Sequence, residues 1–419
     1  METKRKDIKY QLEQGYKLQT IMHYVNKETL RKQHEQQKEN KASGIDGMTK
    51  EKYGVQLEEN LDNLLERMKR FSYCPKPVRK TYIPKSNGKL RGLGIPCYED
   101  KLVQGAMADV LNEIYENIFN DFSYGFRPKK NCHQAISQIN WLIMTKKINY
   151  ILDADIKGFF DNIDHDILIM FLEHEIADKN FLRYIRRFLK AGVIEDYQYY
   201  ESDKGIPQGG LISPILANVY LHYVLDNWFQ VIKKELEGEA YLIRYADDFV
   251  VMFQYEKTAK KFYEMLIERM KKFKLELAAD KTRVLPFGRF KGTKETFDFL
   301  GFTFSNSTTL TGKYRPNIRT SKKKLKQKFE VVKQWLHEKM HEPIIEVGQS
   351  IKKKIVGHYA YYGINGNYTS LIKFYNYIKY TWFRVLRKRG QKNKMKYLDF
   401  KRIWDYLEIP KPKVYVEVW

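Results

Sequence analysis

Apolar positions along the chain switch between helical and strand-like spacing, and this switching predicts the main elements. Apolar side chains recur at helical spacing from Leu57 to Met68, which predicts a helix near residues 51–70. A second helix is expected over residues 99–120. Between these helices, extended runs on either side of the Ser-Asn-Gly sequence at 86–88 predict a hairpin.

Further along the chain, strand patterns alternate with helical ones. The segment "YILDADIKGFFDNIDHDIL" begins as an apolar strand and continues at helix-like spacing. The segment "KGIPQGGLISPILANVYLHYVLD" is a glycine-rich loop that leads into a long amphipathic helix. Alternating strands and helices over residues 80–300 indicate an α/β or α+β domain. Beyond Tyr314 the pattern changes to lysine-rich helices.

Two adjacent acids, Asp247 and Asp248, interrupt the apolar run from Leu242 to Phe253. Strand interiors are depleted of Asp, and buried unpaired carboxylates are costly, so the run is interpreted as two strand halves meeting at the acids. Such a turn holds divalent cations if a third carboxylate approaches, because Mg²⁺ prefers oxygen ligands. Two such ions about 4 Å apart stabilise the attacking and leaving oxygens of a phosphoryl transfer.

Either of two residues could supply the third carboxylate. Asp153 and Asp155 share one strand face by alternation, so spacing does not choose between them. An isolated Asp-Asp pair is also more often an ordinary surface turn than a metal site. The acids alone therefore do not establish a function.

The net charge of the chain indicates a class of binding partner. The 419 residues carry 75 Lys and Arg against 51 Asp and Glu, a formal net charge of +24. Residues 313–419 contain 26 Lys and Arg and 8 Asp and Glu, a net charge of +18, which suggests a separate basic C-terminal domain. A basic excess of this size favours nucleic acid as partner, with a solvated surface or anionic lipid as alternatives.

Cysteine usage and hydropathy suggest a cellular setting. Cys74, Cys97 and Cys132 form no paired spacing, which suits a reducing compartment and argues against a zinc site. No run approaches the roughly 18 apolar residues of a membrane span, and the N-terminus lacks the apolar segment of a signal peptide. We therefore expect a protein of the bacterial cytosol.

Several motifs in a fixed order resemble the reverse transcriptases encoded by group II introns. "YADD" is preceded by "DADIKGFFDNIDH" and "GIPQGGLISPILANVYL", and the resemblance extends to "NKASGIDGMT", "YIPKSNGKLRGLGIP" and "DFSYGFRPKKNCHQAI". After the acids, "LELAADKTRV" and "FDFLGFTF" resemble the last palm motifs, and "GHYAYYGINGNYTSLIKFYNYIKYTWFRVLRKR" resembles the thumb, or maturase, domain. Together the matches cover roughly residues 30–410.

The resemblance implies an α+β right-hand polymerase fold, in which fingers and palm carry a small antiparallel sheet packed on helices and an all-helical basic thumb follows. The expected boundaries are an N-terminal extension at 1–50, fingers with part of the palm at 51–150, and the catalytic palm at 151–312. A helical thumb or maturase domain at 313–405 and a tail at 406–419 follow.

The resemblance also assigns roles to residues. It selects Asp155 over Asp153 and implies that Asp155, Asp247 and Asp248 are catalytic and bind metal, together with Ile156. The implied cofactor is a pair of Mg²⁺ ions, with Mn²⁺ as a substitute. Clustered carboxylates repel one another, which favours cation binding.

Five further residues are expected at the incoming nucleotide. Lys85 and Arg91 flank the predicted hairpin turn and could grip one triphosphate, Arg91 as a fork and Lys85 as a point charge. Phe160, five residues after Asp155, matches the bulky side chain that excludes a ribose 2′-hydroxyl. Gln208 matches a residue near nucleotide and template, and Lys281 is a cation or proton donor near the leaving pyrophosphate. The alternative for each is an ordinary loop or core residue.

Nucleic-acid contacts are expected from cations outside this group. In the C-terminal region aromatics alternate with cations, and we expect most aromatics to form a small core that leaves the cations for phosphates. The expected contacts are Arg127, Lys322, Lys323, Lys324, Arg387, Lys388 and Arg389.

The leading interpretation is an RNA-directed DNA polymerase that extends a primer on an RNA template with deoxynucleotides and also binds, splices and mobilises intron RNA. One alternative is a splicing-only RNA-binding maturase. Another is a stand-alone relative in phage defence, CRISPR spacer acquisition or repair. After "EIPKPKVYVEVW" no endonuclease-type Cys or His cluster follows, so self-directed second-strand cleavage is not expected and a mobile form would borrow its primer.

Overall fold

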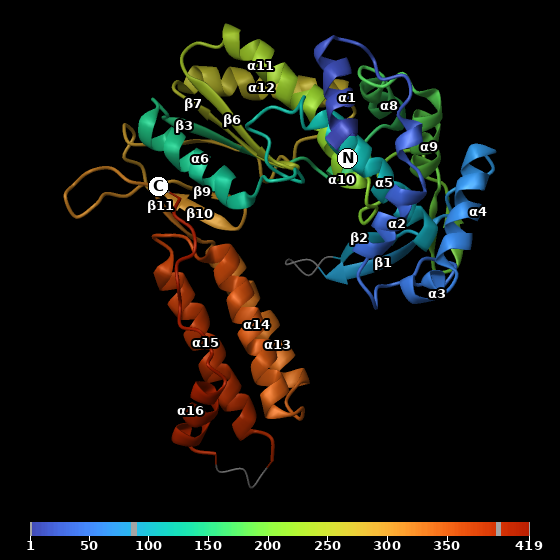
Figure 1. Cartoon of the computed structure of the whole chain (residues 1–419). Coiled ribbons are helices and arrows are strands. Elements are labelled where there is room, and N and C mark those ends of the chain that lie inside the picture. The colour runs from blue at the N-terminus through green and yellow to red at the C-terminus, as the bar shows by residue number, and fades with distance from the viewer. Residues whose placement is uncertain (1, 85–89, 391–394, 419) are drawn as a thin grey trace. The chain divides into compact units, whose positions relative to one another are not determined.

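The protein is described here from a computed structural model that covers residues 2–84, 90–390 and 395–418. The chain forms two compact units (Figure 1). The first consists of Met1–Asn131, Ala154–Val251 and Lys257–Arg283, and the second of Cys132–Asp153, Met252–Glu256 and Val284–Trp419. Each unit is therefore assembled from segments that are distant in sequence.

Helices and strands are interspersed along the chain. The N-terminal part contains α1 (Glu2–Glu13), α2 (Lys27–Gln36), α3 (Lys50–Gly54), α4 (Leu57–Lys69), β1 (Val78–Pro84), β2 (Leu90–Ile95) and α5 (Tyr98–Tyr115). The middle contains α6 (Cys132–Thr145), β3 (Tyr150–Ala154), α7 (Phe159–Asn162), α8 (His165–Leu172), α9 (Lys179–Leu189), β4 (Val193–Glu195) and β5 (Gln198–Tyr200).

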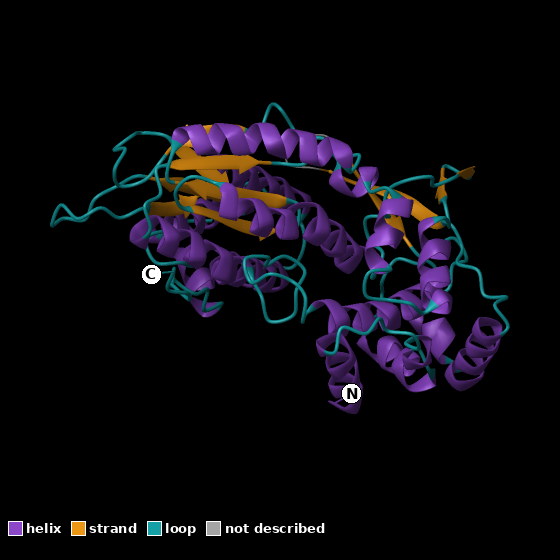
Figure 2. Cartoon of the chain, turned by 90° about the horizontal axis from the view of Figure 1, so that it is seen from above, coloured by secondary structure: helices purple, strands orange, loops and turns teal. Residues whose placement is uncertain are grey.

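The remaining elements lead through the acidic turn to the C-terminal helices. They are α10 (Ser213–Leu221), a π-helical turn (His222–Asp226), α11 (Asn227–Ile232), β6 (Ala240–Tyr245), β7 (Asp248–Phe253), α12 (Glu256–Lys272), β8 (Arg283–Pro286), β9 (Thr296–Phe299), β10 (Phe302–Ser305), β11 (Asn317–Thr320), α13 (Lys322–Glu338), α14 (Ile344–Tyr362), α15 (Tyr368–Arg387) and α16 (Tyr397–Tyr406). Figure 2 distinguishes the helices from the strands by colour. The predicted α+β class is confirmed.

The described strands form three sheets, with the orders β2-β1-β4-β5, β6-β7-β3-β8 and β11-β10-β9. In the first sheet β1 and β2 pair antiparallel from Arg79↔Ile95 to Pro84↔Leu90, as the predicted hairpin requires. Its turn at 86–88 lies outside the described residues.

The helix expected at 51–70 is present in two pieces, since α3 ends at Gly54 and α4 begins at Leu57. The apolar stripe that predicted it is buried, as Leu61, Leu64 and Met68 show. The predicted helix at 99–120 is α5, which ends earlier, at Tyr115. The periodicity therefore located both helices but not their ends.

Aromatic side chains form much of the core of the second unit. Phe374 and Trp382 of α15 are buried, and the Trp382 ring packs edge-on against Phe400 of α16 with ring centroids 5.5 Å apart. Tyr368, at the start of α15, is 47% exposed. The predicted lysine-rich helices beyond Tyr314 are α13 to α16, and strand β11 precedes them.

In the described part of the chain, no helix is both long enough and apolar enough to cross a membrane.

Candidate active site

The two adjacent acids lie where β6 turns into β7. Apolar residues of both strands are buried, and the connection between them consists of Ala246 and Asp247. Ala246 has φ of 56°, in the left-handed region that disfavours residues with a Cβ atom. Asp247 is half-buried and Asp248 is exposed. The turn therefore presents the acids on a backbone that needs external support.

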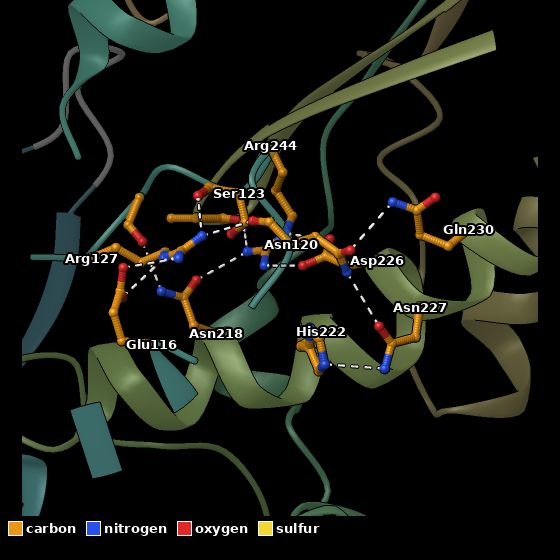
Figure 3. Close-up of polar contacts among 12 residues, drawn as sticks. Glu116, Asn120, Ser123, Arg127, Asn218, His222, Asp226, Asn227, Gln230 and Arg244 are labelled. Atoms are coloured by element: carbon orange, nitrogen blue, oxygen red, sulfur yellow. Dashed lines mark hydrogen bonds and ion pairs between the residues drawn. The ribbon is translucent and has the colours of Figure 1, made fainter. Parts of the chain in front are cut away.

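Arg244 gives that support from inside β6. Its side chain is fully buried and forms an ion pair with the equally buried Asp226 through both carboxylate oxygens (Figure 3). The remaining nitrogen, Nη1, donates to Asn218 Oδ1 and to the Ala246 carbonyl, each at 3.0 Å. One guanidinium thus links the turn to the end of α10 and to the π-helical turn that follows.

Residues 122–125 support the same turn through backbone hydrogen bonds to β6. The Tyr124 amide donates to the Arg244 carbonyl at 2.8 Å, and the Arg244 amide donates to the Phe122 carbonyl at 2.9 Å. Gly125 lies against the turn so closely that a Cβ atom there would be 2.2 Å from the Ala246 backbone nitrogen. Only glycine fits this position without moving the acidic turn.

Asp155 follows directly after β3, in the same compact unit as the acidic turn. Its carbonyl accepts a hydrogen bond from the Ala278 amide at 2.8 Å, and Ile156 forms a bridge with Leu277. This pairing brings Lys281 onto Asp155, and the ammonium group forms an ion pair with Asp155 Oδ2. The "ADKT" segment and the "DADIK" segment therefore meet.

The charges of these residues act on one another. Burial raises the pKa of the Asp247 carboxyl above its ordinary value, and the charge of Asp155 raises it further, whereas Arg91 and Lys281 oppose this rise. The hydrogen bond to Asp155 raises the pKa of Lys281, and the charge of Asp248 adds to this rise. Three acids and two cations from distant parts of the sequence thus share one electrostatic environment.

The donor chemistry of this site fits a divalent cation. Carboxylate oxygens are the ligands that Mg²⁺ prefers, and Asp247 is an anion destabilised by burial and by Asp155, which a nearby cation would offset. Over residues 2–84, 90–390 and 395–418, however, no three Asp, Glu, His or Cys side chains are arranged to hold a metal ion. In this structure Asp155 is instead paired with the Lys281 ammonium through Oδ2.

The residues expected at the nucleotide lie partly in this environment. Arg91 and Gln208 line one pocket, together with Lys80 and Lys204. The Gln208 carbonyl accepts from the Gly94 amide at 2.7 Å, which ties the glycine-rich loop to β2. Lys85 lies outside the described residues.

Phe159 and Phe160 differ in their surroundings. Phe159 is 2% exposed and belongs to the core, whereas Phe160 is half-buried. The Phe160 carbonyl accepts from the Ile206 amide at 2.8 Å, so the backbone of α7 is fastened to the loop that carries Gln208. Of the two rings, Phe160 is the one that retains an accessible surface.

Arg127 does not fit the expectation of a nucleic-acid contact. Its side chain is buried and forms a two-pronged ion pair with Glu116, with nitrogen–oxygen distances of 2.9 and 3.1 Å. Its Nη1 donates to the carbonyls of Asn120 and Ser123 (Figure 3). The prediction for Arg127 is therefore corrected to a structural role, because its donors are directed at the protein.

The expected cations of the second unit are mostly on its surface. Exposed side chains are found at Lys322, Lys323, Lys324, Arg387 and Lys388. Arg389 is half-buried and donates to the Glu342 carbonyl. Five of these six residues thus have charge available to a partner.

Sequence reasoning missed the residues that hold the acidic turn: Asn218, Asp226, Arg244 and Gly125. One signal was present, since Arg244 is a cation inside the apolar run of β6 and a buried cation requires a partner. The identity of that partner, Asp226, depends on how α10 and the π-helical turn pack, which the sequence pattern does not specify.

Comparison with known proteins places this site in a family context. Residues 83–304 match the family model described as "Reverse transcriptase (RNA-dependent DNA polymerase)". The chain is 40% identical over 202 residues to the group II intron-encoded protein LtrA of Lactococcus lactis subsp. cremoris, covering 48% of this chain and 33% of LtrA. Asp155, Asp247, Asp248 and Lys281 all lie within residues 83–304, which match the family model.

Two further relatives extend the comparison. Protein YkfC of Escherichia coli K12 is 31% identical over 307 residues, covering 65% of this chain and 78% of YkfC. The uncharacterized 91 kDa protein in the cob intron of Schizosaccharomyces pombe is 38% identical over 184 residues, covering 44% of this chain and 22% of that protein. The chain thus spans about a third or less of the intron-encoded relatives it matches here.

Proposed function

The chain belongs to the reverse transcriptase family, and on this premise we propose that it is an RNA-directed DNA polymerase that adds deoxynucleotides to a primer 3′ end on an RNA template. The observation that carries the proposal is the shared electrostatic environment of Asp155, Asp247 and Lys281, which come from three separate segments. The predicted fingers, palm and thumb boundaries remain part of this proposal.

We propose that Asp155, Asp247 and Asp248 hold divalent cations, with Mg²⁺ as the preferred ion, Mn²⁺ as its substitute and the backbone of Ile156 as a further ligand. The ions supply positive charge to the attacking and leaving oxygens of the phosphoryl transfer. Coordination through Asp155 Oδ2 would require the ion pair with Lys281 to open, whereas coordination through Oδ1 would not. Lys281 is proposed to donate to the departing pyrophosphate.

The nucleotide contacts follow from the pocket lined by Arg91 and Gln208. Arg91 is proposed to grip phosphate oxygens as a fork, with Lys85 as its companion. Phe160 is proposed to exclude a ribose 2′-hydroxyl by steric contact. The residue's partial exposure supports that role, since a fully buried ring would not meet the sugar.

A role in binding and splicing intron RNA is the second part of the proposal. It is supported by the similarity to group II intron-encoded proteins and by the exposed cations of α13 and of the end of α15. The exposed cations Lys322, Lys323, Lys324, Arg387 and Lys388, together with the half-buried Arg389, are proposed to contact phosphates. We further propose that the protein takes part in mobility of the intron and is located in the cytosol.

Primer extension tests the catalytic part. We expect the purified chain to extend a DNA primer on an RNA template with Mg²⁺ and dNTPs, and we expect Asp247→Ala or Asp155→Ala to reduce extension below detection. Asp405→Ala, at an exposed acid of α16, is the matched control and should retain full activity. Extension by either site variant at the wild-type rate would overturn the proposal, whereas RNA binding without extension by the wild type would favour a splicing-only maturase.

A further inference from the structure

Helix α9 presents a row of cations that the candidate active site does not use. Lys179, Arg183, Arg186 and Lys190 follow one another at helical spacing of four, three and four residues, so they lie on one face. All four are exposed. The opposite face of α9 is apolar and buried, through Phe181, Leu182, Tyr184, Ile185, Phe188 and Leu189.

The surface beside this row is hollowed. The hollow is lined by five cations, one acid and Leu182, the cations being Lys179, Arg183, Arg186, Arg187 and Lys190. The acid is Glu173, which forms an ion pair with Arg186 at 3.1 Å between half-exposed side chains. A pair this exposed is worth little and leaves most of the positive charge available to solvent.

The helix that carries the row is firmly held. The Tyr184 hydroxyl donates to the Met68 carbonyl at 2.7 Å, and Arg187 donates to the Tyr73 carbonyl, which fixes α9 to the end of α4. The Arg183 guanidinium stacks over the exposed ring of Phe71, 4.3 Å from its centroid. The cations are therefore displayed on a rigid support, which reduces the entropy lost on binding.

The shape of the row selects among anionic partners. From Lys179 to Lys190 it extends over about 16 Å of helix, more than one phosphate or one nucleotide needs. Helices that bind a membrane surface insert their apolar face, but the apolar face of α9 is buried in the protein. A polyanion with regularly spaced charges remains.

We propose that the α9 basic row, comprising Lys179, Arg183, Arg186 and Lys190, binds the phosphate backbone of a folded RNA. The RNA assignment rests on the proposed function, while the row itself does not overlap the candidate active site. Arginine forks match phosphate oxygens, and duplex RNA is recognised mainly through backbone and shape, so base-reading side chains are not required. The row adds an RNA-holding surface to the polymerase unit itself.

The test is the salt dependence of RNA binding by the full chain. A blunt-ended RNA hairpin is titrated with Asp247→Ala protein, so that no polymerisation occurs and the result is independent of catalysis. The second protein carries, in addition, Lys179→Gln, Arg183→Gln, Arg186→Gln and Lys190→Gln. If all four cations contact phosphates, the slope of log K against log salt should become shallower by about 3 to 4.

A matched control removes equal charge elsewhere. Helix α12 carries exposed Lys257, Lys261, Lys271 and Lys272, interspersed with Glu264 and Glu268, and their replacement by Gln should leave the slope within about one unit of the parent. Circular dichroism and thermal melting check that both quadruple variants are folded, and primer extension on an unstructured template, measured with Asp247 intact, should be unchanged in both.

Three outcomes would overturn the inference. The first is an unchanged slope in the α9 variant, and the second is an equal loss in the α12 control. The third is a change of slope of equal size when the ligand is a DNA hairpin of the same sequence. The inference fails equally if the α9 substitutions weaken binding to vesicles of anionic lipid but leave RNA binding unchanged. If wild-type protein lacks polymerase activity but the α9 slope changes as stated, the proposed function fails and the RNA surface stands.

Discussion

Replacement of Arg244 separates the stability of the fold from the placement of the candidate catalytic acids. Arg244→Met removes a buried cation from an ion pair whose partner, Asp226, has no exposed surface. An unpaired charge left in such a position costs about 3–5 kcal/mol. The same change also removes the donor to the Ala246 carbonyl, one residue before Asp247.

Asp226→Asn is the matched control, because it breaks the same ion pair while keeping Arg244 and its bond to Ala246. Both variants should therefore lose about 3–5 kcal/mol of unfolding free energy in urea titrations, with unchanged m-values. Only Arg244→Met removes the side-chain hydrogen bond to the Ala246 carbonyl. A displacement of about 1 Å in a reacting group costs on the order of a hundredfold in rate, so its kcat in primer extension should fall by about that factor.

The assay is run at a temperature where both variants are folded, with saturating primer, template and dNTPs. We expect Asp226→Asn to retain kcat within about tenfold of wild type, because its turn is still bonded. Equal losses of kcat in the two variants would refute the positioning argument and leave Arg244 with a purely structural role. A wild-type kcat in Arg244→Met would refute it as well.

Three further predictions follow from single positions. Gly125→Ala places a Cβ against the backbone of the acidic turn and should cost about 1–3 kcal/mol and most extension activity, whereas Gly357→Ala, with open space around it, should be harmless. Burial lowers the pKa of His222 to about 4, so unfolded protein binds more protons between pH 6.5 and 4. Stability contributed by this residue is present above pH 6.5 and is lost as pH falls toward 4, by about 3 kcal/mol in all. The urea midpoint of His222→Gln should therefore fall less steeply with decreasing pH than that of the wild type. An equally steep fall in both proteins would contradict this. Phe160→Ala should raise ribonucleotide incorporation in single-nucleotide assays, whereas Phe159→Ala should lower stability without changing selectivity.

The sequence pattern was sufficient for the strand-turn-strand at the acids. Two short apolar runs around Asp247 and Asp248 predicted β6, β7 and an acidic turn, because burial and strand propensity act locally. It was equally sufficient for the buried stripe of α4. It did not predict the break between α3 and α4, which follows Gly54 and depends on how the two short helices pack.

Contacts between distant residues were beyond the same reasoning. The ion pair of Lys281 with Asp155 joins residues 126 positions apart, and it arises because the Leu277 segment pairs beside Ile156. Arg127 was misread for a related reason. It stands in a basic segment, but Glu116 at the end of the preceding helix folds back and binds it.

Neighbouring residues offset the backbone strain and the charge repulsion at the acidic turn. A residue other than glycine in the left-handed region costs on the order of 1–3 kcal/mol, and the turn also brings Asp247 under the charge of Asp155. Against this, the Ala246 carbonyl is held by a guanidinium that cannot move without unpairing a buried carboxylate. The geometry of the turn is thus coupled to an interaction that is expensive to break. If the acids hold cations as proposed, such coupling favours the reaction, because a turn held before substrate arrives needs no reorganisation during the reaction.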